Sequence, residues 1–247
     1  MDTRVHRPLR SYGRKKGHRL SPRQQQLIDG LLPMLRADPG VPADLRKLFG
    51  RTPGRLALEI GFGSGEHLLW QARANPGWDF IGCEPFLNGM ASLLGHVEKE
   101  KFSNIRLHDG DARDLLGWLP AASLDRVFIL FPDPWPKKRH AKRRLVSADF
   151  LAVLARVMKQ GSELRFASDI PDYVAGALLA AQASGAFEWT ATRAADWRGR
   201  PADWPPTRYE TKALAQGRPS AYLSFRRQPG HLARLIASTA TGGVERG

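Results

Sequence analysis

The chain has 247 residues, of which 42% are hydrophobic and 25% are charged, so it can bury a full hydrophobic core. Its formal net charge of +14 favours a polyanionic partner, with nucleic acid ahead of an anionic membrane. The single cysteine, Cys83, excludes an internal disulfide. No apolar run approaches the roughly 18 residues of a membrane span, and the N-terminus does not follow the pattern of a signal peptide. We therefore expect a cytoplasmic protein that does not bind a membrane.

Both ends of the chain are expected to lie outside the folded domain. Residues 1–20 carry seven Lys or Arg against one acid and follow no helical or strand period, which predicts a disordered basic arm. Such an arm either binds phosphates or only keeps the protein in solution, and the sequence leaves both open. Residues 229–247, with Pro-Gly and Gly-Gly pairs, are interpreted as a flexible tail.

A helical leader is expected over residues 21–54. Ser21 followed by Pro22 is typical of a helix N-cap with proline at the first helical position. Residues 38–54 are rich in Pro and Gly, and one helical turn is expected within them, over 45–49. The leader's apolar face follows helical spacing through Leu27, Ile28, Leu31, Leu32 and Leu35.

From residue 55 onward, strand and helix patterns alternate. The expected strands cover 56–60, 78–83, 104–108, 125–131 and 163–167. The expected helices cover 66–74, 87–101, 114–119, 147–158 and 171–183. Gly161 is expected to end the fourth helix, and two late strands, 187–192 and 221–226, flank a long loop. This order predicts an α/β domain over 55–228 with a doubly wound, mostly parallel sheet and helices on both faces.

Carboxylates stand at or beside the ends of five expected strands. Ligands of open parallel sheets bind outside the carboxyl ends of the strands, so this rim is the expected site. A single acid in such a place is usually a turn residue or a helix cap, but five on one rim favour a binding role. The five are Glu59, Glu84, Asp111, Asp133 and Asp169.

A glycine-rich turn follows the first expected strand, with glycines at Gly61, Gly63 and Gly65. Its third glycine comes one place too early for the dinucleotide fingerprint. Glu59 lies two residues before the turn, and Glu84 ends the next strand, where it can reach both hydroxyls of a ribose. NAD brings a pyrophosphate, whereas S-adenosylmethionine brings an ammonium and a sulfonium, which favour nearby carboxylates. The pattern therefore favours S-adenosylmethionine over NAD, with a purely structural turn as the alternative.

The strand over 125–131 stops at a Pro-Asp-Pro-Trp-Pro turn that presents Asp133 and Trp135. Three prolines in five positions make this turn stiff. Six Lys or Arg follow within eight residues, from Lys137 to Arg144. A carboxylate can accept from a base edge, an indole can stack on a base, and cations hold phosphates. The stretch therefore indicates a nucleic-acid site, against the alternative of a solvated basic helix start after an ordinary loop.

These residues resemble the bacterial tRNA (guanine-N7-)-methyltransferases from about Arg55 to Arg227. The most specific likeness is Phe131-Pro-Asp-Pro-Trp135 with the basic series that ends at Arg144. A second is Thr207-Arg-Tyr-Glu210, where the family more often has Thr-Lys-Phe-Glu.

The resemblance implies a Rossmann-like class I methyltransferase fold, with a seven-stranded sheet whose last strands are antiparallel. It also implies S-adenosylmethionine as methyl donor and a guanine in the variable loop of tRNA as acceptor, in a monomer or a homodimer. The implied cofactor contacts are the glycine turn with Glu59, Glu84, Asp111 and Asp133, and Asp133 is also the implied catalytic residue. The implied substrate contacts are Lys137, Asp169, Thr207, Arg208, Tyr209 and Glu210.

Methyl transfer to guanine N7 needs no base, because N7 carries a lone pair and no proton. Asp133 is therefore interpreted as an orienter that accepts from the guanine N1–H and amine, or from the cofactor. Asp111 is expected beside the adenine, and Trp135 either stacks on the base or packs as a hinge.

Other functions stay open at this stage. One is methylation of another nucleic-acid target, since the Asp-Pro-Trp turn is loosely similar to a turn of enzymes that methylate amines of DNA bases. Others are a non-catalytic RNA-binding module on the same scaffold and an NAD-dependent enzyme. No metal site is expected, because Cys83, His67 and His140 are isolated in spacing.

Overall fold

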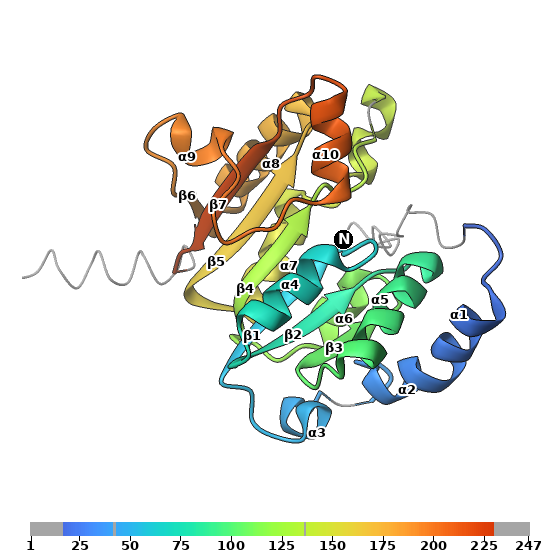
Figure 1. The fold of residues 1–247 in the computed structure, drawn as a ribbon. Helices are drawn as coiled ribbons and strands as arrows, with labels where there is room; N and C mark the ends of the chain where they lie inside the picture. The colour runs from blue at the N-terminus through green and yellow to red at the C-terminus, as the bar shows by residue number, and fades with distance from the viewer. Residues whose placement is uncertain (1–16, 42, 136, 230–247) are drawn as a thin grey trace, which may run out of the picture.

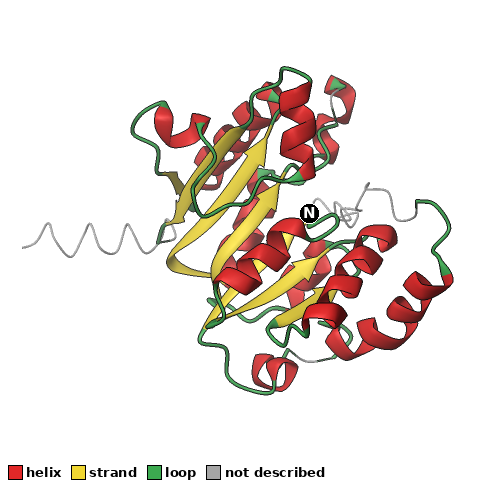
Figure 2. Cartoon of the chain, viewed as in Figure 1, coloured by secondary structure: helices red, strands yellow, loops and turns green. Residues whose placement is uncertain are grey.

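The computed structural model describes residues 17–41, 43–135 and 137–229, and a seven-stranded sheet forms its centre (Figures 1 and 2). The strands lie in the order β3-β2-β1-β4-β5-β7-β6. β7 is antiparallel to both β5 and β6, and the other neighbours are parallel. The predicted fold class is therefore confirmed, including the antiparallel last strands. The bounds are β1 Arg55–Ile60, β2 Trp78–Cys83, β3 Ile105–His108, β4 Leu124–Leu130, β5 Met158–Ser168, β6 Phe187–Trp189 and β7 Ala221–Arg227.

Helices cover both faces of the sheet (Figure 2). Side chains of a strand alternate between faces, so Leu58 of β1 joins the core under α6, α7 and α8, while Ala57 joins the core under α4 and α5. No helix within the described residues is long and apolar enough to cross a bilayer. The bounds are α4 Glu66–Ala74, α5 Leu87–Glu100, α6 Ala112–Trp118, α7 Ala148–Val157 and α8 Pro171–Ser184.

The leader packs onto this domain rather than standing apart from it. Ser21 caps its first helix as the sequence predicts, in a capping box with Gln24. Leu27 and Leu32 are buried in the core beside α5. Residues 1–16 and 230–247 lie outside the described residues, so the basic arm, the tail and the domain bounds stay predictions. The helices are α1 Pro22–Gln26, which continues through a π-helical turn over Leu27–Leu31 into α2 Leu32–Leu35, and α3 Leu45–Phe49.

Three local predictions were wrong. Gly161 does not end α7, which stops at Val157 because Met158 is already extended and pairs with Leu124 of β4. Gly161 instead lies within β5 at a φ of 76°, where the register with β4 shifts. The expected long loop before β7 contains two helices, α9 Ala195–Arg198 and α10 Arg208–Ala215, and β6 ends at Trp189 rather than at residue 192.

Candidate active site

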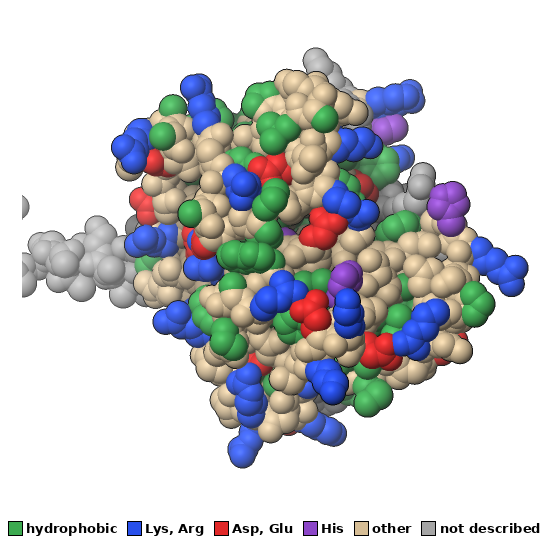
Figure 3. Space-filling model, viewed as in Figure 1, with side chains coloured by type: hydrophobic (Ala, Val, Ile, Leu, Met, Phe, Trp, Pro, Cys, Tyr) green, Lys and Arg blue, Asp and Glu red, His purple; other side chains and the backbone are tan. Residues whose placement is uncertain are grey.

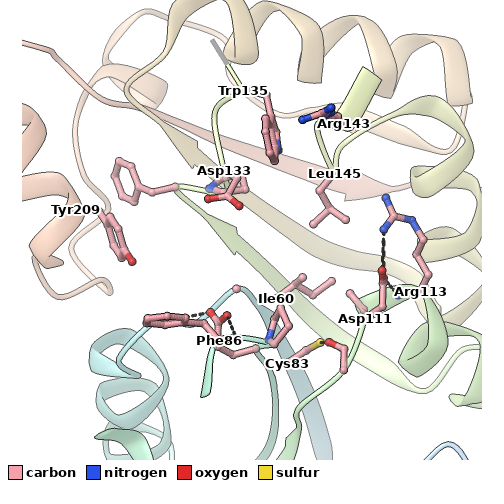
Figure 4. Close-up of a pocket in the computed structure, with 18 residues that line it drawn as sticks. Ile60, Cys83, Phe86, Asp111, Arg113, Asp133, Trp135, Arg143, Leu145 and Tyr209 are labelled. Atoms are coloured by element: carbon pink, nitrogen blue, oxygen red, sulfur yellow. Dashed lines mark hydrogen bonds and ion pairs between the residues drawn. The ribbon is translucent and has the colours of Figure 1, made fainter. Parts of the chain in front are cut away.

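A cavity of about 430 Å³ lies at the carboxyl ends of β1 to β4, where ligands of such sheets bind (Figure 4). The segment that follows each of these strands contributes to its wall. Helix α10 and the basic segment after β4 complete it. The lining residues include Gly61, Gly63, Glu84, Phe86, Asp111, Arg113, Asp133, Trp135, Arg143, Leu145 and Tyr209.

The glycine turn after β1 requires glycine at two positions for different reasons. Gly65 has a φ of 85° at the N-cap of α4, and a Cβ there would lie 2.4 Å from the Leu93 side chain. Gly63 has a φ of 59°, and a Cβ there would lie 3.2 Å from the ring of Tyr209. The turn thus lets the backbone approach the cavity closely while α5 and α10 pack against it.

Glu84 is a buried carboxylate in the cavity wall, at 8% exposure. Its two oxygens accept from the backbone N–H groups of Gly63 at 2.8 Å and of Phe86 at 2.9 Å. Burial raises the pKa of Glu84, the two hydrogen bonds counteract this, and the charges of Asp133 and Glu59 add to the rise. Glu84 thus ties the glycine turn to the start of α5 and holds its charge in a fixed place.

Asp111 has a structural partner as well as a place in the cavity wall. It is the N-cap of α6, where its Oδ1 accepts from the backbone N–H of Arg113 at 2.9 Å. The Arg113 guanidinium also lies 3.2 Å from both carboxylate oxygens. Arg113 lines the cavity and was not predicted from the sequence, although its position two residues after a strand-end acid was a usable signal.

The turn after β4 is backbone-strained on both sides of Asp133. Phe131 has a φ of 50° and Trp135 a φ of 41°, values that residues other than glycine seldom adopt. Such strain persists only where the surroundings enforce it, and it concentrates at functional sites. The turn leaves Asp133 exposed at the cavity.

Cations of the basic segment hold this turn in shape. The Arg144 guanidinium donates to the backbone oxygens of Pro134 and Asp172, both at 3.0 Å. The Arg143 guanidinium lies 4.9 Å from the centre of the Trp135 ring, as a cation–π pair, and His140 meets that ring edge-on. Arg143 and Arg144 of the basic run thus also contact the turn itself, while their binding of phosphates stays a prediction.

The rest of the basic segment is a different case. Lys137, Arg139 and Lys142 are exposed, and none of them forms an ion pair with a carboxylate in the described part of the chain. Over the face drawn in Figure 3, Lys and Arg are spread widely rather than gathered in one patch. The local surplus beside the cavity therefore adds to a general positive field.

Helix α10 brings the second sequence signature to the cavity. Thr207 and Glu210 form a capping box that starts the helix. Tyr209 is 54% exposed and lies over Gly63, and burial, followed by the charge of Glu84, raises its pKa. Arg208 forms an ion pair with Glu66 at 2.5 Å. The spacing of Thr207 and Glu210 is that of a capping box, so the sequence could have predicted the start of this helix.

The structure brings six of the predicted site residues together and leaves seven outside the cavity wall. Inside are Gly61, Gly63, Glu84, Asp111, Asp133 and Tyr209. Asp169 pairs with Arg218 at 2.7 Å, and Glu59 is buried against His67. Outside are Glu59, Gly65, Lys137, Asp169, Thr207, Arg208 and Glu210.

The sheet order and the acid-lined cavity define a class I methyltransferase. Among solved structures, the 16S rRNA methyltransferase KamB matches with a TM-score of 0.58 at 14% identity, covering 76% of this chain and 95% of that one, which supports the fold. The family model "Putative methyltransferase" matches residues 54–223.

Curated relatives narrow the class. The chain is 52% identical over 218 residues to a tRNA (guanine-N(7)-)-methyltransferase of Rhizobium meliloti, covering 87% of this chain and 94% of that relative. It is 51% identical over 219 residues to one of Nitrobacter hamburgensis, covering 88% and 86%. The chain belongs to the tRNA (guanine-N(7)-)-methyltransferase family.

Proposed function

We propose that this protein transfers a methyl group from S-adenosylmethionine to N7 of a guanine in the variable loop of tRNA. The observation that carries the proposal is one cavity with two unlike walls, in a chain half identical to enzymes of that name. One wall is made of carboxylates and the glycine turn. The other is the Asp133 turn with the basic segment. A cytoplasmic monomer or homodimer is part of the proposal.

The carboxylate wall fits the donor. The volume of about 430 Å³ lies in the range of small-molecule sites. Bound S-adenosylmethionine supplies an electrophilic methyl group on a sulfonium, and its two positive charges match the acidic wall. Glu84 would hold the ribose hydroxyls, Asp111 would hold the adenine amine, and the glycine turn leaves room for a ligand close to the backbone.

Asp133 orients the acceptor. Guanine N7 needs no deprotonation, so the chain supplies position and charge, and alignment of two reactants is worth roughly 7–11 kcal/mol in favourable cases. The Asp133 carboxylate accepts from the N1–H and amine of the guanine and stabilises the positive charge that forms on the purine. Because the prolines and the strained neighbours fix this turn, the carboxylate moves little during the reaction.

The other predicted substrate contacts are divided among the base, the RNA backbone and the cap of helix α10. Trp135 and Tyr209 supply flat rings on opposite sides of Asp133 in Figure 4. Lys137, Arg139 and Lys142 bind the RNA backbone. Asp169 and Arg208 contact the substrate after their ion pairs with Arg218 and Glu66 break. Thr207 and Glu210 act through the capping box that presents Tyr209.

Methyl transfer from labelled S-adenosylmethionine to unmodified tRNA tests the proposal, followed by borohydride and aniline, which cleave RNA at 7-methylguanosine. One cut in the variable loop is the expected result. Incorporation of label without a cut would show that an atom other than guanine N7 is methylated. Incorporation into duplex DNA instead of tRNA would show that the substrate is DNA. Cofactor binding without transfer to any nucleic acid would contradict the proposed activity. Loss of cofactor binding altogether would leave an RNA-binding module on the same scaffold.

A further inference from the structure

A buried polar chain begins at Glu59, on the sheet face that α4 covers. Glu59 is 3% exposed and His67 is 2% exposed. The Oε2 atom of Glu59 lies 2.7 Å from Nδ1 of His67. Side chains buried this deeply need partners within the protein, because an unpaired buried polar group is costly.

The hydrogen bonds of Gln71 assign the proton on His67. The Gln71 side-chain oxygen accepts from the Asn75 amide at 3.1 Å, which fixes the orientation of the Gln71 amide. Its nitrogen donates to the backbone oxygen of Asp203 at 2.9 Å and lies 3.2 Å from Nε2 of His67. An amide nitrogen only donates, so Nε2 must accept. His67 is therefore the neutral tautomer, and its Nδ1–H donates to Glu59.

A neutral donor orients Glu59 without cancelling its charge. An imidazolium in the same place would form an ion pair and neutralise the carboxylate. The charge of Glu59 lies close behind the cavity wall, because the two residues that follow it, Ile60 and Gly61, line the cavity. The same charge contributes to the raised pKa of Glu84. The carboxylate behind the glycine turn thus contributes to the negative potential of the wall although it does not line the cavity.

Aromatic rings lock His67 in this arrangement. Its ring centre lies 4.6 Å from that of Phe128 and 5.9 Å from that of Trp204, both edge-on. Trp204 in turn packs at 5.4 Å on Tyr222, whose hydroxyl donates to Glu210 at 2.5 Å. The same buried set therefore connects the glycine turn with the capping box that presents Tyr209.

We propose that His67 is a positioning residue: as the neutral Nδ1–H tautomer it holds Glu59 as an uncompensated carboxylate behind the glycine turn, and this increases affinity for the cationic methyl donor. The inference rests on the proposed function, because it needs a ligand with a positive charge. It predicts that the sulfonium form, S-adenosylmethionine, gains more from this arrangement than the neutral thioether, S-adenosylhomocysteine.

Three single variants of the full chain test it, with dissociation constants for both ligands and the unliganded Tm as readouts. The amide nitrogen of Asn can replace Nδ1, whereas that of Gln replaces Nε2, so His67→Asn keeps the donor to Glu59 and His67→Gln loses it. Without this donor the Glu59 carboxylate loses the hydrogen bond that orients it. Glu59→Gln keeps the shape and the hydrogen bond and removes the charge.

His67→Gln and Glu59→Gln are expected to weaken S-adenosylmethionine binding by about tenfold, as loss of a supporting residue typically does, and S-adenosylhomocysteine binding by less. His67→Asn is expected to stay within about threefold of wild type, although it loses the same ring packing. Equal losses for His67→Asn and His67→Gln, equal losses for both ligands, or wild-type affinity in Glu59→Gln would overturn the inference alone. Failure of the wild-type chain to bind either ligand would overturn the proposed function as well.

Discussion

The two walls of the cavity are built on different physical principles. On the glycine-turn wall, Glu84 is buried and both its oxygens hold backbone N–H groups. On the opposite wall, Asp133 is exposed and its neighbours Phe131 and Trp135 are strained. Outside this wall, in the basic segment that follows it, Lys137, Arg139 and Lys142 are exposed and form no ion pair among the described residues. The first wall is organised for a small ligand before it arrives. The second keeps groups in solvent for a large polyanion that brings its own surface.

The difference has an energetic consequence. Changes on the buried wall are expected to act on cofactor affinity and stability together, because the same hydrogen bonds serve both. Changes on the exposed wall are expected to leave Tm nearly unaltered and to act on turnover or on RNA affinity.

The largest effect is expected for Asp133→Asn. The substitution keeps the shape of the side chain and removes the charge that we propose orients the guanine and stabilises the positive charge on the purine. We expect kcat for tRNA to fall by about 100-fold, as for loss of one stabilising group in other active sites. Tm should stay close to wild type because Asp133 is exposed. The dissociation constant for S-adenosylmethionine is measured beside kcat, because Asp133 also lines the cofactor cavity. Near-wild-type turnover with intact cofactor binding would remove the orienting role.

Glu84→Gln tests the buried wall. A neutral amide accepts ribose hydroxyls and backbone N–H groups more weakly than a carboxylate, so the dissociation constant for S-adenosylmethionine should rise by about tenfold. The side chain also presents an NH₂ group to one of its two N–H donors. Isothermal titration calorimetry at neutral pH measures the change. Unaltered affinity would show that Glu84 does not bind the ribose.

The pH dependence of the same site sharpens this test. Burial raises the pKa of Glu84 above its ordinary value of 4.5, so the folded protein takes up the proton at a higher pH than the unfolded chain does. As the pH is lowered, affinity for S-adenosylmethionine should therefore begin to fall while the pH is still above 4.5. The Glu84→Gln variant should show no such decrease, because it has no carboxylate to protonate at this position. The same sign means that the Glu84 contribution makes the unliganded fold less stable as pH rises through this interval.

A smaller effect is expected from the basic segment. The triple variant Lys137→Ala, Arg139→Ala and Lys142→Ala should raise KM for tRNA several-fold and reduce the slope of log affinity against log salt by about 2 to 3. A matched triple variant removes the same charge at exposed positions on α3 and at the far end of α5, namely Arg46→Ala, Lys47→Ala and Lys99→Ala. If both triple variants changed the slope equally, the basic segment would contribute to tRNA affinity only through the net charge of the protein.

The walls also differ in how far the sequence could predict them. The helix over 66–74 and the strand over 78–83 were predicted to the residue, because their apolar periods and the glycine turn are local signals. Glu84, Asp111 and Asp133 were placed on one rim by the rule that strand ends meet at one edge. The contact of Tyr209 with Gly63 and the cover of Trp135 by Arg143 join segments whose approach only packing decides.

Glu59 illustrates the limit of such reasoning. The sequence placed it two residues before the glycine turn, which is correct, and the alternation of a strand then turns it to the face opposite Ile60. Ile60 lines the cavity and Glu59 does not. A motif therefore gives proximity along the chain, while the strand period decides which side chains face the ligand.

The smallest effect is expected for Tyr209→Phe. The ring of Tyr209 packs across Gly63, and a phenyl ring fills the same space, so kcat/KM for tRNA should change by less than about twofold. Tyr209→Ala is the matched contrast: it removes the ring, and loss of one aromatic contact to a base costs about 1–3 kcal/mol. A hydroxyl that mattered would make the Phe and Ala variants equally slow. That result would mean that the Tyr209 hydroxyl forms a hydrogen bond that the reaction needs. The exposed wall would then resemble the Glu84 wall in depending on a fixed polar contact.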